Sequence, residues 1–336
     1  GNLMNNIDQA MKLMEQAYES MKVMEQAYKL LKAYRKDLDI QSSLPSVAPE
    51  ATVLTKTAIE LDTDFIKAAV VGDQWPVAAN PTAICNKHKN EDKMQRAKGV
   101  VELMIETDLA GKKFLDFGCW EGHMAYHAAK QAGLSVGYDI KERNWPVIGD
   151  ANNNFEPTSN LILTTSWEEM VKNGPYDVIL IFDVLDHANV KDGLDAPGEL
   201  LKKINEELLA PDGTIYMRCH PWISRHGTHI YQEVNKAYVH LVLTDDELLS
   251  LGMNMGEPTH KVIAPIMTYR KWITNAGLHL ENERVIREPM EPFFKTPAIS
   301  KRIIENCQMK DGNGQLMFPE FQTTIAFIDT IMVKNK

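Results

Sequence analysis

Cysteine is scarce in this sequence, and the few cysteines lie far apart. The 336 residues contain four of them, none in a C-x-x-C pair: Cys85, Cys119, Cys219 and Cys307. This spacing supplies neither a disulfide framework nor a thiolate zinc site. The cysteine usage therefore predicts a protein of a reducing, cytoplasmic setting.

Long apolar runs are also missing. No segment approaches the roughly 18 uninterrupted apolar residues of a membrane span, and the opening residues show no basic segment followed by an apolar one. We therefore expect no membrane partner and no targeting signal.

Positive charge is in the minority. The chain has 36 Lys and Arg against 46 Asp and Glu, a formal net charge of -10 and a pI of about 5.5. Proteins that bind nucleic acid through phosphates usually carry the opposite excess, so this balance disfavours a nucleic-acid partner. What the chain has in quantity is apolar residues, at 44%, which is enough to bury a sizeable core.

Methionine is abundant, and it gathers near the start of the chain. Residues 11–18 recur almost unchanged as residues 21–28. Apolar residues follow an a/d spacing over about four heptads, at Ile7, Ala10, Met14, Ala17, Met21, Met24, Tyr28 and Leu31. The pattern predicts a long amphipathic helix within residues 1–40. Two interpretations stand: a coiled coil that forms a homodimer, or a helix that packs on its own globular domain.

The remaining chain divides by composition into two parts. Residues 41–94 begin with a stretch rich in Ser and Pro, typical of a linker, and we expect the rest to cover a ligand site. From about residue 112, short apolar runs alternate with helical stretches. This alternation predicts one α/β domain with a mainly parallel sheet over residues 95–336.

A glycine-containing turn lies between the first predicted strand, residues 113–118, and a predicted helix at residues 123–132. Such turns let a backbone approach a ligand closely. A dinucleotide site requires G-x-G-x-x-G, but Trp120 stands where the middle glycine belongs. An acidic residue, Asp116, precedes Gly118 instead. It would repel a pyrophosphate and attract an ammonium group.

The run from Leu115 to Gly122 closely resembles the first motif of class I S-adenosylmethionine-dependent methyltransferases. The resemblance implies a Rossmann-like methyltransferase fold: a seven-stranded, mostly parallel sheet with helices on both faces and the seventh strand antiparallel beside the fifth. It also implies S-adenosyl-L-methionine as the cofactor. The amino acid end of that cofactor is then assigned to Asp116, Gly118, Cys119 and Gly122.

The resemblance continues in order along the chain. Residues 134–139 are similar to the second strand and end in Asp139, which the family pattern assigns to the ribose hydroxyls. Residues 160–166 are similar to the third, so the resemblance places Ser166 and Trp167 at the adenine. Thr165 and Glu168 have the spacing of a capping box, which predicts Thr165 as the N-cap of the next helix.

Residues 175–187 resemble the fourth strand and the segment after it, with Asp183 on the cofactor side and His187 beyond it. Residues 213–219 follow a Pro-Asp-Gly turn as the fifth strand. The sixth and seventh strands are expected at residues 278–286 and 322–334, after a helix at residues 268–275.

The segment after the fifth predicted strand is rich in histidine and aromatic residues. Its length indicates an inserted substrate lid at about residues 220–267, with candidate acceptor-binding residues Trp222, Arg225, His226, His229 and Tyr231. His220 directly follows the strand and is the first candidate for a general base, because imidazole titrates near neutral pH. His187 is the second. A metal held by histidines of this segment is an open alternative, but our prediction includes no metal.

These patterns together predict a methyltransferase that moves a methyl group from S-adenosylmethionine to an oxygen or nitrogen of a small or medium-sized acceptor by direct displacement. One alternative is an RNA- or nucleotide-directed methyltransferase. Another is a non-catalytic protein that keeps the cofactor fold and works through its N-terminal helix.

Overall fold

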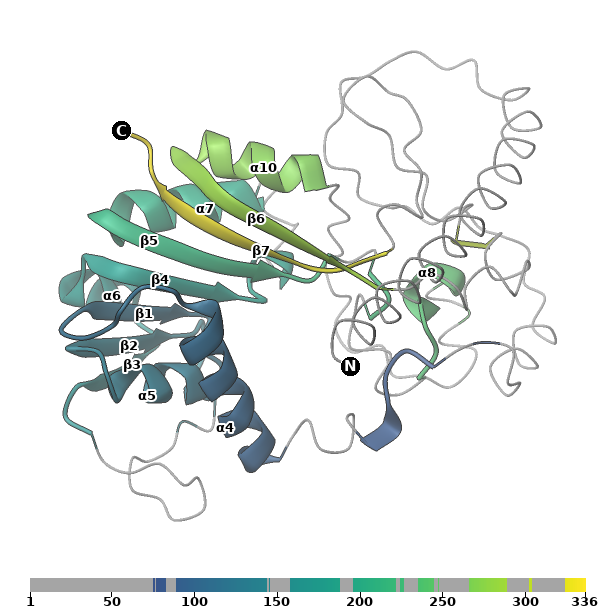
Figure 1. The fold of residues 1–336 in the computed structure, drawn as a ribbon, viewed down its shortest axis with the longest axis horizontal. Coiled ribbons are helices and arrows are strands. Elements are labelled where there is room, and N and C mark those ends of the chain that lie inside the picture. Colours follow the sequence, from purple (N-terminus) through teal and green to yellow (C-terminus); the bar gives the residue numbers. More distant parts are fainter. Residues whose placement is uncertain are drawn as a thin grey trace, which may run out of the picture.

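The fold is taken from a computed structural model (Figure 1), which describes residues 75, 77–82, 89–143, 145, 158–187, 196–221, 224–226, 235–244, 247, 266–288, 302–303 and 324–336. The helix predicted within residues 1–40 and most of the segment at 41–94 lie outside these residues. Parts of the insert predicted at 220–267 do as well.

The described chain is built on one seven-stranded sheet with the order β3-β2-β1-β4-β5-β7-β6. Strands β1 to β5 are parallel, and β7 pairs antiparallel with both β5 and β6. The strands are β1 Lys113–Phe117, β2 Leu134–Tyr138, β3 Leu161–Thr164, β4 Tyr176–Phe182, β5 Leu209–Cys219, β6 Leu278–Arg287 and β7 Ile325–Lys334. This order confirms the predicted fold, including the antiparallel strand beside the fifth.

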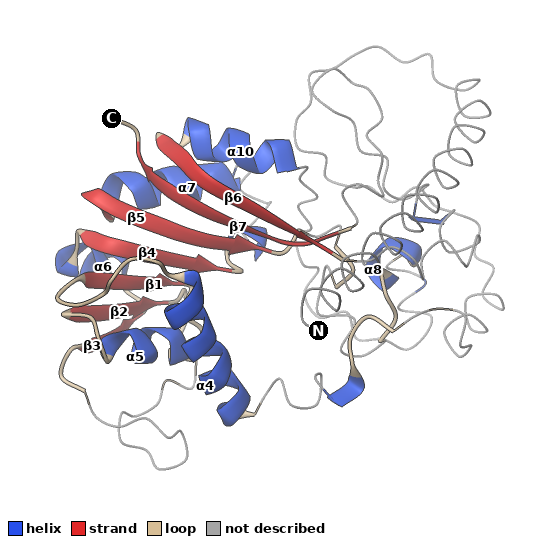
Figure 2. Ribbon diagram, in the orientation of Figure 1, coloured by secondary structure: helices blue, strands red, loops and turns tan. Residues whose placement is uncertain are grey.

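Helices cover both faces of the sheet (Figure 2). Helices α4 Asn90–Gly99 and α5 His123–Ala129, with η1 Val100–Met104, pack on one face, and α6 Trp167–Asn173, α7 Ala196–Glu207 and α10 Ile266–Asn275 pack on the other. Two shorter helices, η2 Leu185–His187 and α8 Val239–Val242, follow β4 and β5. Within the described part of the chain, no helix has the length and apolar character to cross a membrane.

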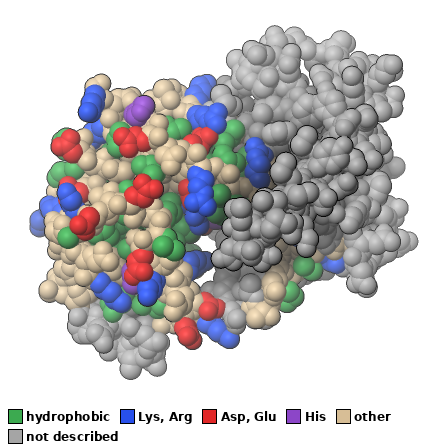
Figure 3. Space-filling view, viewed as in Figure 1, with side chains coloured by type: hydrophobic (Ala, Val, Ile, Leu, Met, Phe, Trp, Pro, Cys, Tyr) green, Lys and Arg blue, Asp and Glu red, His purple; other side chains and the backbone are tan. Residues whose placement is uncertain are grey.

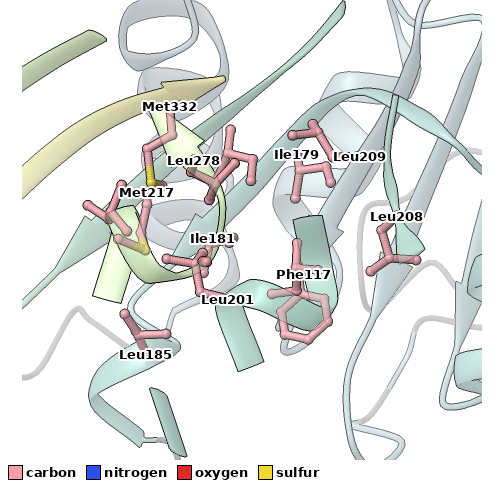
Figure 4. Packing of buried hydrophobic residues seen from close by; sticks show 14 of the residues in the cluster. Phe117, Ile179, Ile181, Leu185, Leu201, Leu208, Leu209, Met217, Leu278 and Met332 are labelled. Carbon is pink, nitrogen blue, oxygen red and sulfur yellow. The ribbon is translucent and has the colours of Figure 1, made fainter. Parts of the chain in front are cut away.

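Strand β4 shows how the two faces are filled. Ile179 and Ile181 enter the larger core with α7 and α10 (Figure 4), whereas Val178 and Leu180 enter a second core with η1 and α5. All four side chains are fully buried. A strand buried on both faces has a continuous apolar run, which is why residues 178–182 of β4 are apolar without alternation.

Several boundaries differ from the prediction by a few residues, and two of these differences are informative. The N-cap of α6 is Ser166, whose Oγ accepts the N–H of Glu169 at 3.2 Å, so the prediction of Thr165 was wrong. Strand β5 begins at Leu209 rather than at residue 213, because Pro211 and Gly213 lie within an irregularity of the pairing with β4.

Residues 75–79 are joined to the insert after β5. The indole N–H of Trp75 donates to the carbonyl of Ala237 at 2.7 Å, and Trp75 is fully buried. The side chain of Asn235 both accepts from the N–H and donates to the carbonyl of Ala79, at 2.9 and 2.7 Å. Two segments about 160 residues apart in sequence therefore contact each other directly.

Candidate functional site

The candidate site lies where parallel strands β1, β2, β4 and β5 end. The carboxyl ends of parallel strands meet at one edge of a sheet, and ligands of open α/β sheets bind there. Asp116 lies near the end of β1, before the glycine turn, and three further polar residues directly follow β2, β4 and β5: Asp139, Asp183 and His220. The topology thus brings the sequence-predicted cofactor residues and the first candidate base to one edge.

The turn after β1 is bound tightly to β2. The N–H groups of Gly118 and Cys119 both donate to the carbonyl of Tyr138, at 2.7 and 2.8 Å. Gly118 has φ +83, and a Cβ on it would lie 2.3 Å from Val184. Only glycine fits this position without displacing a neighbour, so the turn keeps its backbone open toward the strand ends.

Trp120 occupies the middle of this turn in a left-handed conformation, with φ 50. That backbone region costs a residue with a Cβ about 1–2 kcal/mol. Its side chain is 55% exposed. Its carbonyl accepts the indole N–H of Trp145 at 2.7 Å. Trp120 has therefore replaced a glycine in sequence without changing the glycine-type backbone.

Two buried carboxyl groups face this edge. Asp116 is 2% exposed and Asp139 is 7% exposed. The pKa of Asp116 is raised to about 7, chiefly by burial and further by the negative charge of Asp139. A hydrogen bond from the backbone of Ala125 acts in the opposite direction and lowers it. Oδ2 of Asp139 accepts the N–H of Trp120 at 2.9 Å. A ligand that brings a cation and hydroxyl groups would satisfy both carboxylates.

Cys119 is buried against the same carboxyl groups. Burial first, and then the charges of Asp116 and Asp139, raise the pKa of its thiol. The thiol therefore stays protonated and behaves as a small apolar group. A Cβ on Gly137 would lie 3.0 Å from its sulfur, so Cys119 fills the space between the turn and β2.

Ser166 and Trp167 start α6 at the end of β3. Ser166 caps the helix with its hydroxyl. The Trp167 ring packs against Phe117 and Tyr138, each at 5.9 Å between centroids. The Nζ of Lys203 lies 4.0 Å from the Trp167 ring centroid. Both side chains therefore take part in the structure of α6, whatever ligand lies beside them.

The ends of β4 and β5 bring Asp183 and His220 into contact. Nδ1 of His220 and Oδ1 of Asp183 form a hydrogen bond. Asp183 has a left-handed backbone, φ 57, and its N–H donates to the carbonyl of Arg218 at 2.9 Å. The carboxylate is an acceptor, so the imidazole carries its proton on Nδ1. A carboxylate that orients a histidine in this way is a common arrangement for a general base.

His187 lies at the end of η2, close enough to Asp183 and His220 for both to act on its pKa. Displacement of water by the surrounding protein is the largest effect and lowers that pKa. Asp183 raises it, and His220 lowers it further. The two histidines predicted as base candidates therefore share one cluster, in which Asp183 contacts His220 directly.

The acceptor-side residues that the structure describes, Arg225 and His226, contact neighbouring segments of the chain. Arg225 donates from Nε to the carbonyl of Ala78 at 3.1 Å and from Nη2 to that of Val77. Nδ1 of His226 lies 3.8 Å from Oε1 of Glu288. Burial lowers the pKa of His226, and the negative charge of Glu288 partly offsets this by raising it. The other three predicted acceptor-side residues lie outside the described chain: Trp222, His229 and Tyr231.

A pair of histidines one helical turn apart in α5 has structural contacts. Nε2 of His123 lies 2.6 Å from Oδ1 of Asn90, and Nε2 of His127 lies 3.1 Å from Oε1 of Glu102. Burial lowers the pKa of His123 to about 4, so it is neutral near neutral pH. Among the residues that the structure describes, no group of three or more His, Cys, Asp or Glu is placed to hold a metal ion.

Three residues of the site escaped the sequence reasoning. Ile140 directly follows Asp139 and is 79% exposed, an unusual position for a large apolar side chain. Arg143 stacks on Trp120, with Cζ 4.2 Å from the ring centroid. Glu288 follows β6 at the same edge. Ile140 could have been identified from its place directly after the acidic residue at the end of β2. No sequence pattern marks Arg143 or Glu288.

Residues 86–235 match the family model described as a methyltransferase domain. The match identifies this part of the chain as a methyltransferase domain. It covers β1 to β5, and the antiparallel β7 beside β5 completes the predicted strand order. S-adenosylmethionine is the cofactor of this domain. A comparison with curated proteins finds no match.

Solved structures of methyltransferases are similar to this chain at low identity. An S-adenosylmethionine-dependent methyltransferase from Mesorhizobium loti is 13% identical with a TM-score of 0.40, covering 70% of this chain and 97% of its own. Magnesium protoporphyrin IX methyltransferase from Synechocystis PCC 6803, with bound S-adenosylhomocysteine, is 15% identical with a TM-score of 0.40, covering 82% and 95%. Because these TM-scores are below 0.5, the assignment depends on the family match and the strand order.

Proposed function

We propose that this methyltransferase acts on a hydroxyl or amine of a small or medium-sized acceptor, with His220 as the general base and Asp183 as the residue that orients it. The contact between Asp183 and His220 at the ends of β4 and β5 carries the proposal. Such a pair removes a proton near neutral pH, which transfer to a hydroxyl or an ammonium requires.

The residues at the ends of β1, β2 and β3 suit the cofactor. Asp116 would hold the ammonium group, because a cation relieves the repulsion between two buried carboxyl groups. Asp139 would accept the ribose hydroxyls. The turn of Gly118, Cys119 and Gly122 would lie along the amino acid end. Ile140, with its exposed apolar side chain beside Asp139, would cover the adenine together with the backbone at Ser166 and Trp167.

The chemistry of His220 follows from its tautomer. When bound, S-adenosylmethionine supplies an electrophilic methyl group. With its proton on Nδ1 and donated to Asp183, His220 presents Nε2 as the basic atom. The acceptor oxygen or nitrogen would give its proton to Nε2 as it takes the methyl group, and the electron pair of the broken sulfur–methyl bond would stay on the sulfur of S-adenosylhomocysteine. The Asp183 carboxylate then stabilises the imidazolium.

Substitution of His220 tests the base directly. A screen of phenols, catechols, alcohols and amines with radiolabelled cofactor first identifies a working acceptor. His220→Gln should then lower kcat by about a hundredfold or more, with the affinity for the cofactor unchanged. Asp183→Asn, which favours the wrong tautomer, should lower kcat and shift the acidic limb of the pH profile to lower pH, because the imidazolium loses its carboxylate partner.

The control for this test is Lys130→Ala on α5, which lies away from the strand ends and should keep the wild-type rate. An unchanged kcat in His220→Gln at all pH values would show that His220 is not the general base. His187→Gln, with a smaller expected loss, separates the two candidate histidines.

A nucleic-acid acceptor has less support. The net charge is -10, and acidic and basic side chains are interspersed over the described surface in view in Figure 3. An even mixture of charges does not attract a phosphate backbone. The same screen with tRNA and ribosomal RNA decides this alternative. A chain that binds the cofactor but transfers no methyl group to any acceptor would favour the non-catalytic reading.

A further inference from the structure

Trp120 and Arg143 form a stacked pair directly beside the carboxylate assigned to the ribose. Trp120 extends from the glycine turn after β1, and Arg143 comes from the segment after β2. The guanidinium carbon lies 4.2 Å from the centroid of the indole ring. A cation placed over an indole face is attracted by its π electrons. The pair joins the two loops that border the cofactor side of the sheet.

Both oxygens of Asp139 are engaged in this arrangement. Oδ2 accepts the backbone N–H of Trp120 at 2.9 Å. Oδ1 lies 3.7 Å from Nε of Arg143. This second contact is an ion pair that is too long for a hydrogen bond. The side of Asp139 that a ribose hydroxyl would approach is therefore the side that faces Arg143.

Arg143 is poorly satisfied where it lies. Its Nε is buried, and within the described residues it has no hydrogen-bond acceptor. A buried donor without an acceptor is costly, and more so when it belongs to a charged group. Among the described residues, the Arg143 guanidinium contacts Trp120 through the stack and Asp139 through the long ion pair, so a better donor to Oδ1 can replace it.

We propose that Trp120 and Arg143 belong to the cofactor site: Arg143 leaves Asp139 when the ribose hydroxyls bind, and the Trp120 ring forms the outer wall of the bound cofactor. The proposal rests on the proposed function, because it takes Asp139 as the ribose acceptor. It assigns a purpose to the tryptophan that replaces a glycine. The 55% exposed ring becomes covered when the cofactor is present.

The first measurement needs no cofactor and no acceptor. Arg143→Ala uncovers the indole face, so acrylamide should quench Trp120 more strongly than in wild type. Trp120→Phe, compared in both backgrounds, identifies the signal of this one tryptophan. Lys130→Ala is the matched control, since its Nζ lies 5.4 Å from the ring centroid of Tyr126 on α5. That variant should leave the quenching unchanged.

The second measurement is stopped-flow binding of S-adenosylmethionine and S-adenosylhomocysteine. Association that requires a side chain to move is slow. Arg143→Ala should therefore associate about two- to fivefold faster, the factor expected for the loss of one stacked or paired cation. Trp120→Gly suits the left-handed backbone and should raise the dissociation rate of both ligands, because the wall is removed.

The outcomes separate this inference from the function on which it rests. If wild type binds the cofactor but Arg143→Ala binds it at the same rate or more slowly, Arg143 does not have to leave Asp139 for binding. The inference is then overturned. An unchanged dissociation rate in Trp120→Gly would show that the Trp120 ring does not cover the bound cofactor. If wild type does not bind S-adenosylmethionine at all in a calorimetric titration, the cofactor assignment itself fails, and the inference fails with it.

Discussion

Asp116 shows how one carboxyl group is prepared for a cation. It is almost completely buried at the end of β1, and the second carboxyl group at this edge, Asp139, belongs to the neighbouring strand. Burial and the negative charge of Asp139 raise its pKa to about 7. In the free protein, the carboxyl is therefore mostly protonated below that pH. A bound ammonium group favours the carboxylate, so binding must release a proton.

This release predicts a pH dependence of cofactor affinity. Below the pKa of about 7, the affinity should rise by up to about tenfold per pH unit as the pH increases, and it should level off above that pKa. Calorimetric titrations between about pH 5.5 and pH 7.5, below the usual pKa of the cofactor's own amino group, measure the slope. Asp116→Asn should bind more weakly and show no slope. An equal slope in that variant would assign the proton to another group.

The sequence identified the residues of the edge better than it identified their pairings. Asp183 and His220 each follow an apolar run, so their place at strand ends could be predicted. Their contact could not, because it depends on the left-handed backbone of Asp183 and on the alignment of β4 with β5. The stack of Arg143 on Trp120 was hidden for the same reason, since its two members belong to different loops.

Helix α7 is held close to α10 by a glycine. Gly198 is buried in the first turn of α7, and a Cβ on it would lie 2.6 Å from the ring of Trp272. Trp272 is itself buried in the larger core. The contact therefore positions the two helices that cover one face of the sheet behind β5.

Gly198→Ala tests this packing. In an exposed helix the substitution would stabilise by roughly 1 kcal/mol. Here the added methyl group must displace a buried indole ring, and overpacking of a core typically costs about 1–3 kcal/mol. We expect a net loss of about 1–2 kcal/mol in the free energy of unfolding, measured by urea denaturation. Glu199→Ala, exposed on the same helix, should be nearly neutral. A stabilised Gly198→Ala would contradict the close approach.

Elements with strong periodicity were predictable, and their junctions were less so. The seven strands follow from apolar runs, but the end of β3 was misplaced because Ser166 rather than Thr165 caps α6. The contacts of Trp75 and Asn235 follow no periodic pattern in the sequence. Their side chains donate to backbone carbonyls far away in sequence, and only the folded chain brings these groups together.

At the scale of the whole molecule, the sheet places two chemically different halves side by side. Acidic groups at β1 and β2 suit a cationic cofactor with a ribose, and the histidines after β4 and β5 suit proton removal from an acceptor. The order of motifs along the chain predicted this division. The identity of the acceptor was not predictable, because histidine, arginine and aromatic side chains can contact acceptors of many chemical classes.

The N-terminal pattern makes a separate prediction about assembly. If the apolar a/d spacing within residues 1–40 forms a coiled coil, the full chain should sediment at about twice its mass of 38.0 kDa. A chain without those residues should sediment as a monomer. Sedimentation velocity of both chains, at equal concentration, provides the comparison. An unchanged number of chains per particle after truncation would favour the helix as part of its own domain.

The central claim is that the edge formed by β1 and β2 binds S-adenosylmethionine through Asp116 and Asp139. Isothermal titration calorimetry of wild type against Asp139→Ala tests it without any knowledge of the acceptor. Wild type should bind one cofactor per chain. Asp139→Ala should lose at least about tenfold in affinity, the factor expected when hydrogen bonds to a carboxylate are removed. No binding by wild type, or equal affinity in the two proteins, would contradict the claim.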